Sequence, residues 1–389
     1  MVQNINGHYL STYPIVTPVL ITPLYVIPYL ILKIFNYPMN MLDPEFQLVV
    51  AVMEKISASI IASLSCMFVF LILNRLVIKK IAVLTTLIYA FGSSTWSVSS
   101  QELWQHGLAE LLLAMLIYFV ILNETRYSNK TVSVLGALLA LFIFNRPADG
   151  FLVLPILLYI IIFYKEKIIY FAVPLFIISL PFIFYNFYYF KTIFGGYSSM
   201  ISYLGLNYTL LSNLLGLLLS PSRGLLVYTP ILILSIPGYL LARDICSKKI
   251  KFLLLIYGPI IIIQIMFYSS FAIWWAGWSY GPRFLTGMLP ILFIFIGLYL
   301  NQYLLIEGFG RKILILILLL SIWSIFVQVV GAFFYPNGWW NGIPTNIDAH
   351  PERVWDWSDS QIIRTFLAGP AVHNPWDSWE RVANYFHRI

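Results

Sequence analysis

Charged residues are scarce in this chain of 389 residues: Asp, Glu, Lys and Arg make up 10% of it, whereas 60% is hydrophobic. Soluble domains are typically about a quarter charged, so this deficit excludes an ordinary soluble fold. The mean hydropathy is +0.84, and many apolar runs approach the ~20 residues that cross a bilayer as a helix. Barrel strands would instead alternate over about ten residues. The sequence therefore predicts an all-α polytopic membrane protein.

Cysteine and local catalytic motifs are also nearly absent. The two cysteines, Cys66 in an apolar run and Cys246 in a basic loop, predict no disulfide. The chain has no Walker A sequence, no GxGxxG in a βαβ context, and no HExxH, GxSxG or DxD motif. The net charge of +7 needs no nucleic acid to explain it, because loop Lys and Arg orient the helices of any such protein. We expect no nucleic-acid partner.

About ten membrane spans can be drawn, roughly over residues 56–77, 81–98, 104–122, 131–144, 150–164, 168–190, 225–242, 252–270, 284–303 and 313–335. The preceding stretch YPIVTPVLITPLYVIPYLILKIF is apolar enough to insert, but its four prolines predict a broken helix in the outer interface. Charge returns after residue 335. The predicted organisation is a transmembrane domain over residues 1–335 and a small extracytoplasmic, aromatic-rich cap over residues 336–389 with one or two helices.

Alternate loops differ in positive charge. One set carries 13 Lys and Arg residues, and the other set carries six before the C-terminal tail. The positive-inside rule places the first set in the cytoplasm. We therefore expect a multi-pass protein of the plasma membrane with both termini outside.

Tryptophan is distributed with the same asymmetry. Under this topology none of the twelve Trp residues lies in a cytoplasmic loop. The stretch WWAGWSYGPRFL places Trp274, Trp275, Trp278 and Tyr280 just before Arg283. An aromatic belt at the headgroups would decorate both interfaces. The asymmetry favours an outer aromatic cavity for a sugar or lipid headgroup over a pure belt.

Polar residues also collect on the predicted outer face. Glu102, His106 and Glu110 are spaced i, i+4, i+8 and would share one face of a helix. Glu110 would lie inside the membrane, where an ionisable group is costly and often marks a polar interior. For Glu102 and His106, catalysis and helix capping are both open.

Three arginines lie in Gly- or Pro-rich turns on this side: Arg146 with Asp149 in NRPADG, Arg223 in SPSRGLL, and Arg283. Arginine offers two parallel donors and stays charged when desolvated, so the three together predict a site for a pyrophosphate or lipid phosphate. The alternative for each is contact with phospholipid headgroups or an ion pair, such as Arg146 with Asp149.

The order of these segments resembles the polytopic GT-C glycosyltransferases, particularly the branch related to protein mannosyltransferases and the aminoarabinose transferase. The matching stretches are distributed over most of the length of the chain and are NGHYLSTYPIVTPVLITPLY, WSVSSQELWQHG, FNRPADGFLVLPILLY, LLLSPSRGLLVYTPILIL, WWAGWSYGPRFLTGMLPIL and HPERVWDWSDSQ. The resemblance implies sugar transfer from a polyprenyl-phosphate donor to a glycan, lipid or protein acceptor at the outer face. It implies that outer arginines neutralise the phosphate, that Glu102 and His106 belong to a polar catalytic cluster, and that a divalent metal is compatible with the site.

Family members usually begin with one more helix and an outer loop that carries a key carboxylate, whereas this chain starts just after that point. The sequence thus predicts an incomplete or truncated form, or one whose base is lost or relocated. Two alternatives stay open: a transporter of lipid-linked sugars, and a non-catalytic partner subunit of an envelope complex.

Overall fold

The computed structural model describes residues 2–5, 7–37, 39–40, 43–125, 128–198, 204, 209–304 and 311–371. Within them the chain is mostly helical, and the strands β1 (Val2–Ile5) and β2 (His8–Ser11) form one antiparallel hairpin. The α-helices are α1 (Val16–Ile34), α2 (Pro44–Leu76), α3 (Lys79–Phe91), α4 (Gln105–Thr125), α5 (Asn129–Asn145), α6 (Leu154–Phe163), α7 (Ile168–Phe190), α8 (Leu210–Leu219), α9 (Leu225–Tyr228), α10 (Ser235–Leu241), α11 (Lys248–Ser269), α12 (Leu289–Leu304), α13 (Arg311–Phe333) and α14 (Gln361–Leu367).

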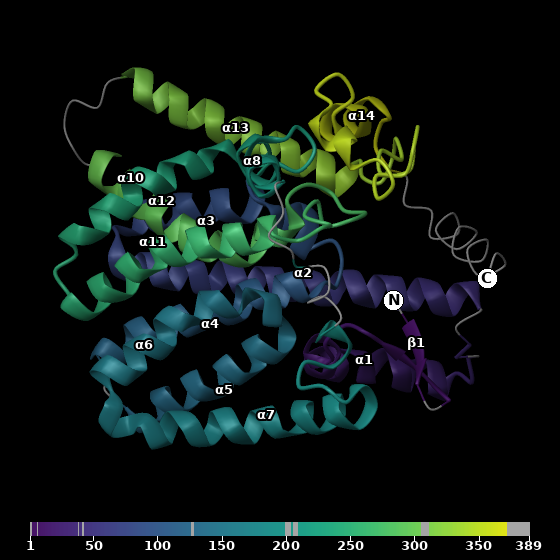
Figure 1. Ribbon diagram of the computed structural model, residues 1–389, viewed down its shortest axis with the longest axis horizontal. Helices are drawn as coiled ribbons and strands as arrows, with labels where there is room; N and C mark the ends of the chain where they lie inside the picture. Colours follow the sequence, from purple (N-terminus) through teal and green to yellow (C-terminus); the bar gives the residue numbers. More distant parts are fainter. Residues whose placement is uncertain are drawn as a thin grey trace.

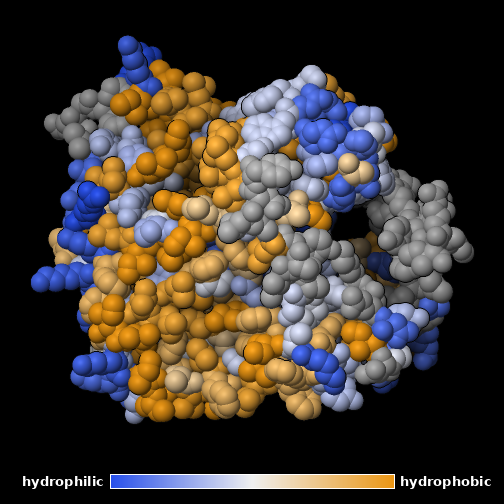
Figure 2. Space-filling model, in the orientation of Figure 1, coloured by the Kyte–Doolittle hydropathy of each residue, from blue (hydrophilic) through white to orange (hydrophobic). Residues whose placement is uncertain are grey.

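Seven helices in the described part of the chain are long and apolar enough to cross a membrane. They cover Val16–Ile34, Phe46–Leu76, Gln105–Glu124, Lys165–Phe190, Lys248–Ser269, Arg283–Tyr303 and Arg311–Phe333. Figure 2 shows a broad apolar surface with hydrophilic residues gathered toward its two ends. The fold therefore has the character of a multi-pass helical membrane protein.

The helices pack as two groups on either side of α2 (Figure 1). α2 packs along α4, α5 along α7, and α10 along α12. Two of these contacts depend on glycine: a Cβ at Gly136 would collide with the backbone of α7 at Phe171, and one at Gly238 with the backbone of α12 at Phe295. Small residues at such crossings allow the close backbone approach by which membrane helices associate.

The prediction of a proline-broken helix before the first span is wrong, because α1 runs continuously from Val16 to Ile34. Pro18 lies in the first turn, where its missing N–H would have had no helical partner. Pro23 and Pro28 lie inside the helix. Each removes one backbone hydrogen bond without ending α1.

Two predicted spans are interrupted in the structure. In place of a helix over 81–98, α3 ends at Phe91 and a separate π-helix, η1 (Thr95–Ser99), follows. The Ser93 hydroxyl donates to the Tyr89 carbonyl (2.6 Å), a local bond that competes with helix continuation. In place of a helix over 225–242, α9 ends at Tyr228, and after Thr229 the 3₁₀ helix η5 (Pro230–Leu234) begins and leads to α10.

Residues 336–371 fold over one end of the bundle, beside the C-terminal end of α13 (Figure 1). They contain the 3₁₀ helix η8 (Pro351–Trp355) and α14. We call residues 336–371 the cap. The rest of the predicted tail, 372–389, lies outside the described residues.

Candidate functional site

Two neighbouring cavities lie at the capped end of the bundle. Cavity 1 has a volume of about 210 Å³ and is lined by residues of α2, the α3–α4 connection, the segment before α12 and the start of the cap. Cavity 2 has a volume of about 190 Å³. Trp104 and Arg283 line both. The two cavities therefore meet at the arginine that the sequence places among tryptophans.

Arg283 begins the 3₁₀ turn η7 (Arg283–Met288), which leads into α12. The chain before it folds back through left-handed residues at Ala276, Gly277 and Gly281. The Arg283 Nη2 donates to the Ala276 carbonyl (2.6 Å), and its guanidinium carbon lies 4.3 Å from the centroid of a Trp104 ring. Its Nε and Nη1 are shielded from solvent and have no hydrogen-bond partner among the described residues. Two donors of a desolvated cation are thus left for a ligand, and leaving them unpaired is costly.

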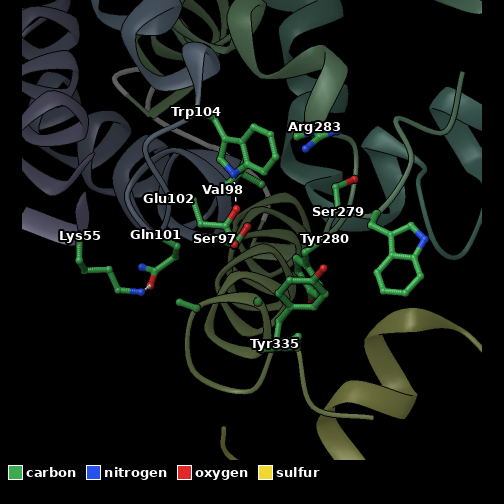
Figure 3. A pocket seen from close by; sticks show the side chains of 14 residues that line it. Lys55, Ser97, Val98, Gln101, Glu102, Trp104, Ser279, Tyr280, Arg283 and Tyr335 are labelled. Carbon is green, nitrogen blue, oxygen red and sulfur yellow. Dashed lines mark hydrogen bonds between the residues drawn. The ribbon is translucent and has the colours of Figure 1, made fainter. Parts of the chain in front are cut away.

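Glu102 lies on the side of Trp104 away from Arg283 (Figure 3) and accepts a hydrogen bond from the Trp104 indole. Residues 101–103 are held by α2: the Lys55 ammonium donates to the Gln101 side chain (2.7 Å), and Glu54 accepts from the Leu103 amide (3.1 Å). Glu102 as a residue is exposed, yet protein atoms crowd its carboxylate. Loss of hydration raises the pKa of Glu102 above its usual value near 4.5, and the indole bond offsets part of this rise.

The expected common helical face of Glu102, His106 and Glu110 does not form, because α4 begins at Gln105. Glu102 faces cavity 1, whereas His106 lines cavity 2. Glu110 is fully buried and accepts from three hydroxyls, those of Tyr89 (3.0 Å), Thr95 (2.9 Å) and Ser99 (2.7 Å). Two of these hydroxyls, those of Thr95 and Ser99, belong to η1. Glu110 therefore fixes the turn whose residues Ser97 and Val98 line cavity 1.

Arg146 lines cavity 2, but protein groups engage its guanidinium. It pairs with Asp149 (3.3 Å between Nε and Oδ2), contacts the His106 ring, and donates to the Tyr268 hydroxyl (2.8 Å). Tyr268 in turn donates to Asp149 (2.6 Å). This matches the ion-pair alternative for Arg146 and Asp149, and of the two only Arg146 lines cavity 2.

Arg223 lies outside both cavities and bonds only to protein. Its five guanidinium hydrogen bonds reach the carbonyls of Trp275 (2.8 Å), Ser222 (2.6 Å) and Gly277 (3.1 Å) and the side chains of Gln361 (2.7 Å) and Asn341 (2.7 Å). Its guanidinium carbon lies 5.2 Å from the centroid of a Trp340 ring. Arg223 therefore joins the cap to the WWAGWSYGPRFL segment, and the structure does not bring it together with Arg283 at a shared cavity.

The four predicted aromatic residues also have different places, because some line a cavity and others make contacts that hold the fold and the cap. Trp278 and Tyr280 line cavity 1. Trp274 instead packs against Gly216 of α8. The Trp275 indole donates to Asp348 (2.9 Å) and the Trp278 indole to Asn346 (3.1 Å), so both hold the cap.

Sequence analysis missed Lys55 and Asp348, which line cavities 1 and 2. Asp348 is exposed, and one carboxylate oxygen accepts the Trp275 indole. The only signal for it was its place in an acidic tail. Its position depends on a contact that spans 73 residues. Cavity 2 thus has a carboxylate of its own, contributed by the cap.

A divalent metal needs several carboxylate or imidazole ligands that converge. The described residues contain no group of three or more His, Cys, Asp or Glu side chains that could hold one. The residues at these cavities therefore do not fit a resident metal.

Comparisons of the chain with protein-family models, with curated proteins and with solved structures give no match.

Proposed function

We propose that the chain is a membrane glycosyltransferase that moves a sugar from a polyprenyl-phosphate donor to an acceptor at the extracytoplasmic face. The observation that supports it is Arg283, whose two unbonded donors lie where two cavities meet. A planar guanidinium suits a phosphate oxygen pair. The charge bias of the loops supports the sidedness, since the cavities lie at the end with few lysines.

In this reaction the donor phosphate lies beside Arg283 and its sugar extends into cavity 1, between Trp278 and Tyr280. Glu102 takes the proton of the acceptor hydroxyl, and the acceptor oxygen bonds to the anomeric carbon. The bond between that carbon and the phosphate oxygen breaks, and its electron pair stays on the phosphate. Arg283 stabilises this developing charge in a site with little water. Arg146, held by Asp149, lines the neighbouring cavity, and Arg223 holds the cap.

The experiment is transfer of labelled sugar by the purified protein in proteoliposomes, using a panel of polyprenyl-phosphate sugars. Donor binding is measured in parallel. The proposal is supported if the wild-type protein transfers the sugar and an Arg283 variant does not. Binding without transfer, with movement of the donor between leaflets, replaces it with a transporter.

Replacing Glu102 with glutamine is expected to lower kcat by about 10²–10⁴-fold, the usual contribution of a general base. Asp348→Asn is expected to cost less than tenfold in kcat, because asparagine keeps an oxygen for the Trp275 indole. Asp356→Asn is the matched control: Asp356 is an exposed cap residue whose oxygen serves only a local turn with Ser358 (2.6 Å). Inactivity of Asp348→Asn together with a fully active Glu102→Gln would assign the base to the cap.

The pH profile should report the same carboxylate. A base works in its ionised form, and loss of hydration raises the pKa of Glu102 above 4.5. The rate should therefore fall as pH is lowered through a pKa that lies above 4.5, and should recover as pH rises. Glu102→Gln should remove this acidic limb, as seen in kcat measured from pH 4 to pH 8 (roughly the range a carboxyl of this kind spans). An unchanged limb in that variant would mean that another group titrates.

A further inference from the structure

A third cavity continues the series at the capped end. Cavity 3 has a volume of about 260 Å³ and shares Tyr197 and Phe271 with cavity 2. Cavity 2 in turn shares Trp104 and Arg283 with cavity 1. The three cavities therefore follow one another in the order 1, 2, 3, with two common residues at each junction.

The chemistry of the walls changes between the second and third cavities, because cavities 1 and 2 both carry charged side chains and cavity 3 does not. Cavity 1 carries the ionisable groups of Lys55, Glu102 and Arg283. In cavity 2, Arg283, Arg146 and Asp348 face a mostly aromatic wall in which Tyr268 and Phe284 stack with ring centroids 4.9 Å apart. Cavity 3 has no charged residue in its described lining, which is apolar apart from Tyr197 and Ser198. Two charged cavities followed by an apolar one fit a ligand with a polar head, an anionic centre and an apolar chain.

Cavity 3 has walls from three parts of the chain. Pro147 and Ala148 come from the turn after α5, Phe194 from the segment after α7, and Phe267 and Phe271 from the end of α11 and the residues just after it. A β-bridge between Leu204 and Phe271 crosses one side. Moving a hydrocarbon chain from the bilayer into an apolar cavity gains little from the hydrophobic effect, because lipid is equally apolar. Such a chain is therefore held in cavity 3 by dispersion contacts with walls on opposite sides.

We propose that the three cavities form one binding site for an amphiphile with an isoprenoid chain, and that cavity 3 holds the units of the chain next to the phosphate. The inference rests on the proposed function and adds where the donor chain lies. With the chain in cavity 3, the phosphate reaches Arg283 from the side of cavity 2, and the sugar passes Trp104 into cavity 1. The Asp348 carboxylate, bonded to Trp275, stays at the exposed side of cavity 2.

A second route is less suitable. A groove on α2 is lined by Lys55, Ile56, Ser59, Ile60, Ser63, Leu64 and Met67 and meets cavity 1 at Lys55. All of its lining residues belong to one helix face. Without an opposed wall, a chain there has the same contacts that membrane lipid would have.

The test is photolabelling of the full-length protein in proteoliposomes by a polyprenyl phosphate that carries a diazirine on its second isoprene unit. Adducts are mapped by mass spectrometry. We expect them on Phe194, Tyr197 and Phe271, and we expect excess unlabelled polyprenyl phosphate, but not phosphatidic acid, to suppress them. Adducts confined to residues 56–67, or equal competition by phosphatidic acid, would overturn the assignment.

Ser198→Trp fills cavity 3 and should lower the labelling at least tenfold, whereas Ser63→Trp, on the α2 groove, should leave it unchanged. Leu204→Trp serves the same purpose should Ser198→Trp fold poorly, because Leu204 bridges Phe271 through its backbone. Equal labelling in wild type and both cavity variants would contradict the site. Labelling needs no sugar transfer, so labelling in cavity 3 without transfer would refute only the proposed function. Transfer with labelling on α2 would refute only the chain site.

Discussion

Replacing Arg283 with alanine is expected to slow sugar transfer by about 10²–10³-fold in kcat, the loss typical when a donor to a developing oxyanion is removed. The reason is that Nε and Nη1 have no partner in the described part of the protein and lie between the two cavities. They are the donors that the proposed donor phosphate would engage. Lysine at this position should recover only part of the rate, since it keeps the charge but not the two parallel donors. Single-turnover transfer from a saturating donor measures this step.

The matched control is Arg311→Ala, which removes an exposed arginine from the first turn of α13. It should leave kcat unchanged, because Arg311 lines none of the three cavities. The fold of Arg283→Ala should survive, since among the described residues the side chain makes one hydrogen bond, to the Ala276 carbonyl. Full transfer by a folded Arg283→Ala protein would remove the central observation behind the proposed function.

The sequence could single out Arg283 and Glu102, which both line cavity 1, because both are charged residues in short polar turns of a chain with few charges. It could not separate Arg283 from Arg223. Both follow small residues and precede apolar runs, and their difference depends on distant partners. The partners of Arg223 include Trp275, Asn341 and Gln361, which are 52, 118 and 138 residues away. Hydrogen bonds of this range leave no local pattern.

The same reason explains which helices were predicted well. Long apolar runs such as those of α7, α11 and α13 form helices in a membrane, because a helix satisfies the backbone hydrogen bonds within the segment. Their length and apolar composition are therefore enough to predict them. The stretch that became α3 and η1 is different, because its path depends on a buried carboxylate in another helix. Glu110 accepts from Thr95 and Ser99 and thereby fixes a π-turn where the sequence predicts a continuous span. Such π-turns are frequent at functional sites, and this one lies beneath cavity 1.

Replacing Arg223 with alanine should lower the free energy of unfolding by about 3–5 kcal/mol, because five neutral acceptors lose a charged donor and each buried group left unsatisfied typically costs about 1–3 kcal/mol. Arg223 is buried, and its five hydrogen bonds join α14 and the cap to the segment before Arg283. Without it, the carbonyls of Trp275 and Gly277 lose their donor inside the protein. Lysine should restore only part of the stability, because an ammonium has three donors for five acceptors. Equilibrium unfolding in mixed detergent micelles measures the change.

The contrast with Arg283 makes this result diagnostic. Arg283→Ala should change the unfolding free energy by less than about 1 kcal/mol, or raise it, since it removes a buried cation whose donors are not satisfied. Arg223→Ala should lose transfer only in proportion to the fraction unfolded, so added lipid or lower temperature should restore its kcat. Loss of Arg223 would then affect mainly stability and loss of Arg283 mainly transfer, although the sequence predicts both arginines for one phosphate site. Equal destabilisation by both variants would show that Arg283 supports the fold as Arg223 does, and its open donors would then carry no argument for a bound phosphate.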